Sequence, residues 1–184
     1  MSGARQIAAK MICLASASLL NTNIATADSI GLRFAQTFMG TCVHDFPDVS
    51  KLKAASKTFG WKEITDPNVK ALMAPSDPSL SWQGWYMVVD SDKYFVGISD
   101  GVSEGKTFHT CSLVQDKVDV KATISELVKL LNANKLDETV EAGQRYGTWE
   151  FKNNGSSLLL MTTDGTPMNY DLINASVITD FRSK

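Results

Sequence analysis

Two short motifs combine the residue types that bind metals, and they occur in mirror order. The first is Cys42-Val43-His44 and the second is His109-Thr110-Cys111. Two thiolates and two imidazoles make a complete tetrahedral set for zinc, or a soft site for copper(I). One residue between the members of each pair is tighter than the spacing usual in zinc sites. A metal site that uses His44 and His109 is therefore one interpretation of these motifs.

A second pattern matches the nucleophile motif of serine hydrolases, because Gly101-Val102-Ser103-Glu104-Gly105 fits G-x-S-x-G. That chemistry requires a strained turn from a strand into a helix. Here a strand pattern resumes at Lys106 and no helix pattern follows. Two glycines at a hairpin turn explain the pentapeptide without catalysis, so a hydrolase that uses Ser103 is an alternative and not our main interpretation.

Three aromatic residues follow a loop that contains Pro75 and Pro78. Tryptophans more often pack in a core than contact a ligand, but Trp82 is placed at the open end of the expected sheet. Trp85 and Tyr86 are neighbours in the next strand, so their side chains lie on opposite sides of it. An apolar concavity with a few polar groups is the usual form of a ligand site. Trp82, Trp85 and Tyr86 are therefore the candidates for ligand binding.

The first 27 residues have the features of a signal peptide. Arg5 and Lys10 form a basic start, Met11 to Leu20 is a short apolar run, and Ala25-Thr26-Ala27 is a cleavage pattern. Ten apolar-leaning residues are too few to span a bilayer, which takes about 20. We expect residues 1–27 to be removed, and residues 28–184 to form one periplasmic or secreted domain without a membrane span.

Composition limits the possible partners. The chain has 18 basic and 20 acidic residues, and removal of the leader takes two basic residues and no acidic one. A mildly acidic chain with scattered charge does not favour nucleic acid, which a basic stripe recognises. Phosphate-binding glycine loops, dinucleotide fingerprints and calcium loops are missing from the sequence. We expect no cofactor, and as partner a small molecule or an envelope protein.

The two cysteines outside the leader offer the second interpretation of the mirror motifs. Once Cys13 has left with the leader, Cys42 and Cys111 remain, and an even pair in an oxidising compartment predicts a disulfide. This bridge would fasten the N-terminal helices to the strand over 106–114. Both histidines would then lie beside the junction, where two imidazoles alone make an incomplete metal site. We favour the disulfide over the metal.

Periodicity predicts the elements. Apolar residues at helical spacing predict helices over 29–39, from 48 to about 59 with Asp48 as N-cap, a short one from Pro67, and 120–132. Alternation predicts strands over 85–90, 94–99, 106–114, 146–152, 156–163 and 168–173, and a short one over 176–180. Hairpin-length connections imply antiparallel pairing. The fold class is α+β: an antiparallel sheet of six to seven strands, one covering helix over 120–132, and N-terminal helices docked by the disulfide.

With Cys42, Phe46-Pro47-Asp48, Gly60-Trp61 and Cys111 in place, the chain resembles small exported proteins of proteobacteria without an assigned function. This resemblance implies export and one disulfide, and brings no activity or catalytic residue with it. The sequence therefore predicts an exported binding or interaction module that is not an enzyme. The alternative is a hydrolase or metal-dependent enzyme that uses Ser103 or the His44 and His109 pair.

Overall fold

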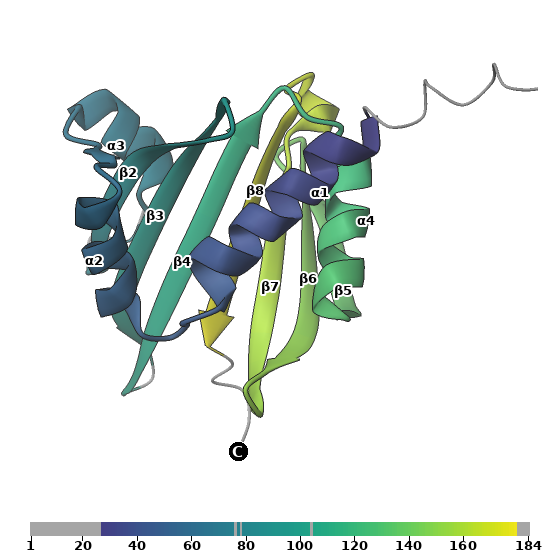
Figure 1. The fold of residues 1–184 in the computed structure, drawn as a ribbon. Helices are drawn as coiled ribbons and strands as arrows, with labels where there is room; N and C mark the ends of the chain where they lie inside the picture. The colour runs from purple at the N-terminus through teal and green to yellow at the C-terminus, as the bar shows by residue number, and fades with distance from the viewer. Residues whose placement is uncertain (1–26, 76, 78, 104, 180–184) are drawn as a thin grey trace, which may run out of the picture.

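The computed structural model describes residues 27–75, 77, 79–103 and 105–179, and over these residues eight strands form one antiparallel sheet (Figure 1). The strands are β1 (Lys62–Glu63), β2 (Ser81–Val89), β3 (Asp92–Ser103), β4 (Lys106–Asp116), β5 (Asn134–Glu141), β6 (Gln144–Asn153), β7 (Ser156–Asp164) and β8 (Leu172–Thr179). Their order across the sheet is β1-β2-β3-β4-β8-β7-β6-β5. The predicted α+β class and antiparallel pairing are confirmed, with more strands than predicted. The predicted leader over 1–27 lies almost wholly outside the described residues.

Four α-helices accompany the sheet over the described ranges, and two shorter helical turns interrupt the chain. They are α1 (Ala27–Phe38), the π-helical turn η1 (Met39–Val43), α2 (Val49–Thr58), α3 (Pro67–Met73), α4 (Val120–Leu131) and the 3-10 turn η2 (Thr166–Met168). The prediction that the first helix ends at residue 39 is wrong, because the chain continues helically through η1. This extra turn carries Cys42 and Val43 into the interior.

Aspartate N-caps fix where the later helices begin. The Asp48 carboxylate accepts from Ser50 N, and the Asp119 carboxylate accepts from Ala122 N at 2.9 Å. Asp66 does the same for α3, which has Pro67 in its first turn. At the other end of α2, Gly60 takes the left-handed conformation that ends a helix most readily, with φ of +64°. The predicted N-cap at Asp48 is confirmed.

One face of the sheet, which we call the helix face, packs against α1, α4, η1 and α2. Strand alternation sends every second side chain there, and together with the helices these form the hydrophobic core. Core members from the strands are Trp85, Met87, Tyr94, Val96, Ile98, Cys111, Leu113, Trp149, Phe151, Leu158, Leu160, Ile173, Ala175 and Val177. Figure 1 shows α1 and α4 side by side over this face. The predicted covering helix is thus α4, and α1 shares its role.

A glycine lets α1 and α4 approach closely. A Cβ on Gly31 would lie 3.2 Å from the Thr123 Cα, which is tighter than ordinary packing allows. The absence of a side chain at Gly31 therefore permits backbone contact between the two helices. Thr123 is fully buried there, and its hydroxyl donates to the Asp119 carbonyl at 2.7 Å.

The opposite face of the sheet, which we call the outer face, is not part of the core cluster. Its side chains form three rows across β2, β3, β4, β8 and β7. The rows are Trp82, Ser99, Thr110, Ile178 and Leu159; Gly84, Gly97, Ser112, Ser176 and Met161; and Tyr86, Phe95, Val114, Asn174 and Thr163. Val114 and Leu159 are buried in these rows, yet they lie outside the core cluster.

Two strand predictions differ from the structure. The predicted strand over 168–173 is wrong, because η2 and Asn169, with φ of +61°, occupy its first half and β8 begins only at Leu172. β8 then runs as one strand where a separate short strand over 176–180 was predicted. The second difference is β5, which the sequence does not predict. All eight of its residues are exposed, so it has no alternating pattern to detect.

Among the residues that the structure describes, no helix is long and apolar enough to cross a membrane.

Candidate functional site

The structure separates the three aromatic residues that the sequence singles out. Trp82 and Tyr86 both lie on the outer face of β2, two positions apart in its alternation. Trp85 points to the helix face, where it is 3% exposed. There its ring meets the edge of Trp61, with centroids 6.5 Å apart. Trp82 and Tyr86 therefore share one face and stay candidates for ligand binding, whereas Trp85 is a core residue.

Trp82 lies flat on the outer face because two glycines leave room beneath its ring. A Cβ on Gly84 would lie 2.4 Å from the indole Cη2, and one on Gly97 would lie 3.0 Å from the indole Nε1. Any side chain at Gly84 would therefore lift the ring away from the sheet. Beside it, the Tyr86 and Phe95 rings pack with centroids 5.0 Å apart. Together these rings form an aromatic platform on β2 and β3.

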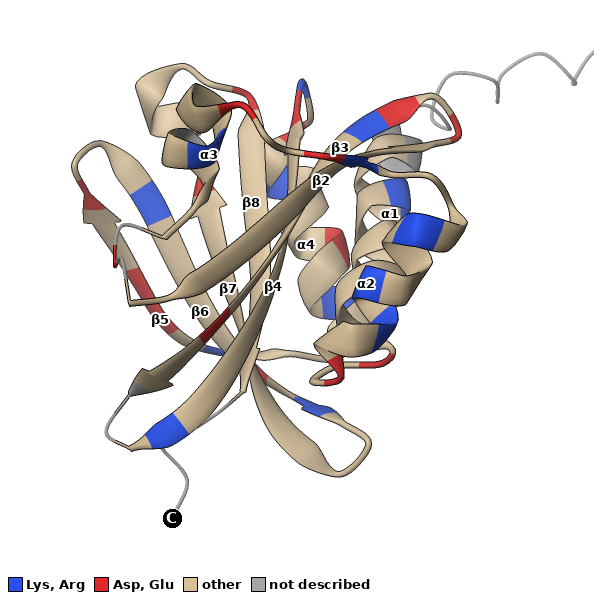
Figure 2. Cartoon of the chain, turned by 90° about the vertical axis from the view of Figure 1, so that its left-hand side faces the viewer, with Lys and Arg blue, Asp and Glu red and all other residues tan. Residues whose placement is uncertain are grey.

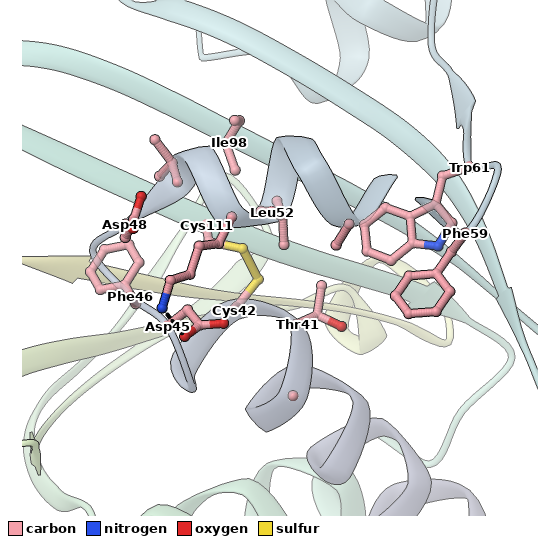
Figure 3. Close-up of a pocket in the computed structure, with 14 residues that line it drawn as sticks. Thr41, Cys42, Asp45, Phe46, Asp48, Leu52, Phe59, Trp61, Ile98 and Cys111 are labelled. Carbon is pink, nitrogen blue, oxygen red and sulfur yellow. Dashed lines mark hydrogen bonds and ion pairs between the residues drawn. A yellow bond between two sulfur atoms is a disulfide. The ribbon is translucent and has the colours of Figure 1, made fainter. Parts of the chain in front are cut away.

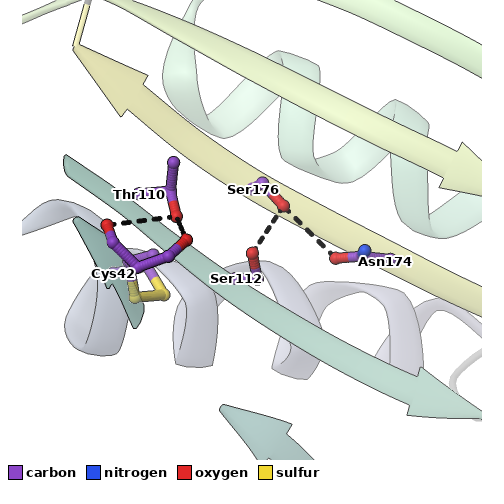
Figure 4. Close-up of a disulfide and its surroundings, with 7 residues drawn as sticks. Cys42, Thr110, Ser112, Asn174 and Ser176 are labelled. Atoms are coloured by element: carbon purple, nitrogen blue, oxygen red, sulfur yellow. Dashed lines mark hydrogen bonds between the residues drawn. A yellow bond between two sulfur atoms is a disulfide. The ribbon is translucent and has the colours of Figure 1, made fainter. Parts of the chain in front are cut away.

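Hydroxyl groups occupy the middle of the outer face. The hydroxyls of Ser99 and Thr110 bond to each other, and those of Ser112 and Ser176 do so at 2.7 Å (Figure 4). Ser176 also donates to the Asn174 Oδ1 at 3.3 Å. Because these groups accept and donate hydrogen bonds among themselves, the middle of the outer face is polar without being charged.

Over β2, β3, β4, β8 and β7, no charged residue occurs in the three rows of the outer face, and charge begins at the adjoining strands, with Lys62 of β1 opposite Tyr86 and Glu150 of β6 opposite Leu159. Figure 2 shows the contrast: lysines gather on α2, whereas β2 and β8 carry no charged residue. In a sheet with one face on the core, the face directed at water usually carries polar, often charged, side chains. An uncharged strip of aromatic, small and hydroxyl residues is the feature of this face that needs an explanation.

The disulfide predicted from the sequence is confirmed. Cys42 on η1 and Cys111 on β4 are joined, with their Cα atoms 5.3 Å apart, and both are buried (Figure 4). Neither sulfur is therefore a thiolate that could bind a metal. The bridge fastens the N-terminal helical segment to the centre of the sheet, as expected.

The two histidines beside the bridge have separate carboxylate partners. His44 Nδ1 lies 3.4 Å from the Asp45 Oδ1, and the His44 side chain is 77% exposed. His109 Nδ1 lies 2.7 Å from the Asp100 Oδ1. Within the described ranges, no group of three or more potential ligands could hold a metal ion. The geometry thus supplies no ligand set for the metal interpretation.

The hydrolase pattern also lacks the local structure that its chemistry needs. Ser103 is the last residue of β3 and pairs with Lys106, the first residue of β4. Glu104 lies outside the described residues. A nucleophile elbow leads from a strand into a helix, whose amides help to bind the oxyanion. This turn instead leads from strand to strand.

The structure also contains a cleft that the sequence did not predict, which we call the disulfide cleft. It has a volume of about 160 Å³ and lies between η1, α2 and the helix face of the sheet. It is lined by Gly40, Thr41, Cys42, Asp45, Phe46, Asp48, Val49, Lys51, Leu52, Ala55, Phe59, Trp61, Ile98 and Cys111. Figure 3 shows Phe59 and Trp61 at one end of the cleft, with Asp45 and Asp48 toward the other.

The aromatic end of this cleft includes an exposed phenylalanine. Phe59 fits the helical spacing of the apolar residues of α2, yet it is 72% exposed and stacks on Trp61, with centroids 6.5 Å apart. The Trp61 ring also packs edge-on against the buried ring of Trp85. The only sequence signal for this cleft was the occurrence of aromatic residues just outside both ends of α2, namely Phe46 before it and the pair Phe59 and Trp61 after it.

The polar end of the cleft holds an ion pair. Lys51 Nζ lies 2.7 Å from the Asp45 Oδ1, and this hydrogen bond lowers the pKa of Asp45 and raises the pKa of Lys51. Hydrogen bonding from Ser50 lowers the pKa of Asp48. Both carboxylates are therefore ionised at neutral pH, and Lys51 alone among the lining residues balances them.

A second cavity of about 180 Å³ lies between the start of α4 and strands β5, β6 and β7. Its charged lining residues are Lys121, Glu138, Arg145 and Asp164. Arg145 Nη1 lies 3.8 Å from the Asp164 Oδ2, and Glu138 pairs with Lys135 at 3.0 Å. Because Glu138, Arg145 and Asp164 already take part in ion pairs, this cavity points less clearly to a ligand.

Comparison with known proteins gives no further guide to function. No protein family, no curated protein and no solved structure matches the chain.

Proposed function

We propose that this protein is an exported binding module that docks an envelope protein through the outer face of its sheet. The observation that carries the proposal is the uncharged composition of the three rows around Trp82 and Tyr86. The centre of a protein–protein interface is depleted in charge and enriched in aromatic residues and Met. Tyr, Trp, Ser, Gly and Asn are also the residues that antibody-type binding surfaces favour, and the rows contain all five.

The size of the outer face agrees with such a role. Strands lie about 4.8 Å apart, and residues on the same face of a strand about 6.8 Å apart, so the three rows cover on the order of 500 Å². A standard interface buries about 800 Å² on each partner. The rows would thus form the central part of an interface, with charged residues at its rim. A neutral protein surface fits this face better than nucleic acid or anionic lipid, which need a basic patch.

Binding also asks less of the chain than catalysis does. A catalyst needs a nucleophile or base, an orienting partner and charge stabilisation at one point. Ser103 lies at a strand-to-strand turn, and His44 and His109 each pair with a different carboxylate. These placements favour the binding module over the hydrolase or metal-dependent alternative.

The export part of the proposal rests on the leader-like segment and agrees with the disulfide. The pattern at Ala25-Thr26-Ala27 precedes Asp28, and disulfides persist in oxidising compartments. N-terminal sequencing of protein recovered from the periplasm or the medium should begin within a few residues of Asp28. Recovery of chains that retain Met1 from the soluble fraction would overturn this part.

Photocrosslinking in cells tests the docking face. A photoreactive residue at Met161, which is 39% exposed on the outer face, should crosslink to one discrete envelope protein. The same residue at Leu130 on α4, which is 42% exposed, is the matched control and should not. The crosslinked protein is then purified and titrated with wild type, Trp82→Ala, Met161→Lys and Leu130→Lys.

We expect Trp82→Ala and Met161→Lys to weaken binding at least tenfold, because a charge or a lost ring at the centre of an interface is costly. Leu130→Lys should bind as wild type does. Equal crosslinking from Met161 and Leu130, or wild-type affinity in both outer-face variants, would refute the docking face. Thermal unfolding of each variant confirms that the fold is intact.

A further inference from the structure

We propose that the disulfide cleft is a binding site for a small organic amine whose apolar part is a single ring or a branched chain. This site is independent of the outer face, because Ile98 and Cys111 contribute to its lining from the helix face of the sheet. The two sites can therefore be tested separately.

Size sets the scale of the ligand. The volume of the cleft is about 160 Å³. An apolar cavity of about 150 Å³ is large enough to bind benzene. A larger ring system would have to displace the walls, which the covalent bond between Cys42 and Cys111 holds in place. The cleft therefore suits one ring or its aliphatic equivalent.

The arrangement of the lining gives the ligand its direction. Phe59 and Trp61 lie at one end, Asp45 and Asp48 lie toward the other, and Leu52 lies between them (Figure 3). The apolar part of a ligand would pack against Leu52 and the two rings, with its head toward the carboxylates. Of the lining residues, only Phe59 is a largely exposed aromatic side chain, which places it at the mouth of the cleft.

Charge selects a cationic head. The ionisable lining residues are Asp45, Asp48 and Lys51, which leave one negative charge in excess. The lowered pKa values of the two aspartates agree with this balance. Asp45 already accepts from Lys51, so an ammonium head would share this carboxylate with Lys51. The aromatic faces of Phe59 and Trp61 also attract cations, whereas an anionic head would meet two carboxylates.

Three single-ring probes of similar size separate charge from shape: benzylamine, benzyl alcohol and benzoate. Each is titrated into the folded, oxidised protein, and binding is followed by the NMR signal of the Trp61 indole N–H and by calorimetry. We expect benzylamine to bind at least fivefold more tightly than benzyl alcohol, and benzoate to bind most weakly.

Variants that remove a negative or a positive charge from the cleft test the role of charge directly. Asp45→Asn should reduce the preference for benzylamine over benzyl alcohol to less than twofold. Lys51→Met should increase that preference, because it leaves both carboxylates unbalanced. Ala55→Leu should weaken benzylamine and benzyl alcohol alike by filling the cleft. Glu126→Gln on α4, a carboxylate that does not line the cleft, is the matched control and should leave all affinities unchanged.

Several outcomes would overturn the proposal. Equal affinity for the three probes would leave only an apolar cavity, and tighter binding of benzoate would assign the site to an anion at Lys51. If no probe binds at millimolar concentration while the Trp61 signal shows a folded protein, the cleft is not a ligand site. If Asp45→Asn and Lys51→Met change the preference in the same direction, the charges of the cleft do not select the amine.

Discussion

Asp100 and His109 face each other directly across β3 and β4, and the His109 Nδ1 lies 2.7 Å from the Asp100 Oδ1. The register therefore gives His109 a local partner on the neighbouring strand. This relationship makes the histidine a structural residue of the sheet, and it lies on the same face of β4 as Cys111.

The first prediction concerns this pair. We expect His109→Ala and Asp100→Ala each to lower the free energy of unfolding by about 1 kcal/mol, because each removes a partly buried hydrogen bond. The double variant should cost less than the two single changes together, since the second change has no bond left to break. Urea denaturation of the four proteins measures this coupling. A fully additive cycle would show that the pair does not interact in solution.

The second prediction concerns the disulfide. Replacement of Cys42 and Cys111 by Ala should lower the free energy of unfolding by about 4 kcal/mol, because a bridge across 69 residues restricts the unfolded chain strongly. Chemical denaturation in urea is the measurement. Wild-type protein unfolded under a reductant is the control and should match the variant. A loss below about 1 kcal/mol would mean that the reduced chain keeps its fold by packing alone.

The third prediction concerns Tyr94. Its ring is 1% exposed, and burial raises the pKa of its hydroxyl above the usual value, although a hydrogen bond with Thr37 acts in the opposite direction. The fold therefore favours the neutral phenol. This contribution to stability is complete below pH about 10, the unfolded value, and is lost as pH rises through the folded pKa.

An alkaline absorbance titration measures this difference. Of the four tyrosines, one should ionise later than the others in wild type, and Tyr94→Phe should abolish the late step. Tyr170→Phe, at a position that is 63% exposed, should instead remove part of the early step. A late step that survives in Tyr94→Phe would contradict the assignment.

The fourth prediction concerns the flat indole on the outer face. Gly84→Ala should displace the Trp82 ring, because the added Cβ would lie 2.4 Å from it. We expect a cost of about 1 to 3 kcal/mol from overpacking and a change in near-ultraviolet circular dichroism. In a Trp82→Phe background most of the spectral change should disappear. Gly40→Ala is the control, because a Cβ there meets nothing within 4 Å.

Local signals made most of the elements predictable. Asp48 and Pro67 mark helix starts without reference to the rest of the chain, and the alternation of β4 and β7 comes from one buried face. β5 escaped prediction because none of its residues is buried. The strand predicted over 168–173 was wrong in its first half because the apolar residues there, Met168 and Tyr170, are exposed in a turn.

The sites depend on relationships that a linear pattern does not contain. Trp82 and Tyr86 share a face because β2 begins at Ser81, earlier than the alternation after the proline loop indicated. The disulfide cleft needs Cys111 and Ile98 from the sheet beneath α2, residues far away in the chain. Phe59 fits the helical period of α2, yet it is exposed because the helix ends there and the chain turns at Gly60.

The pairing of β4 with β8 has a consequence for the order of folding. β8 is the last strand that the structure describes, and it completes the centre of the sheet by pairing over 110–116 with β4. Until β8 has been synthesised, β4 presents an open edge and the helix face lacks Ile173, Ala175 and Val177. Such long-range pairing is slow to form. The chain therefore cannot complete the centre of its sheet before β8 has been synthesised, and an unfolded chain is the form in which a polypeptide can pass through a membrane pore.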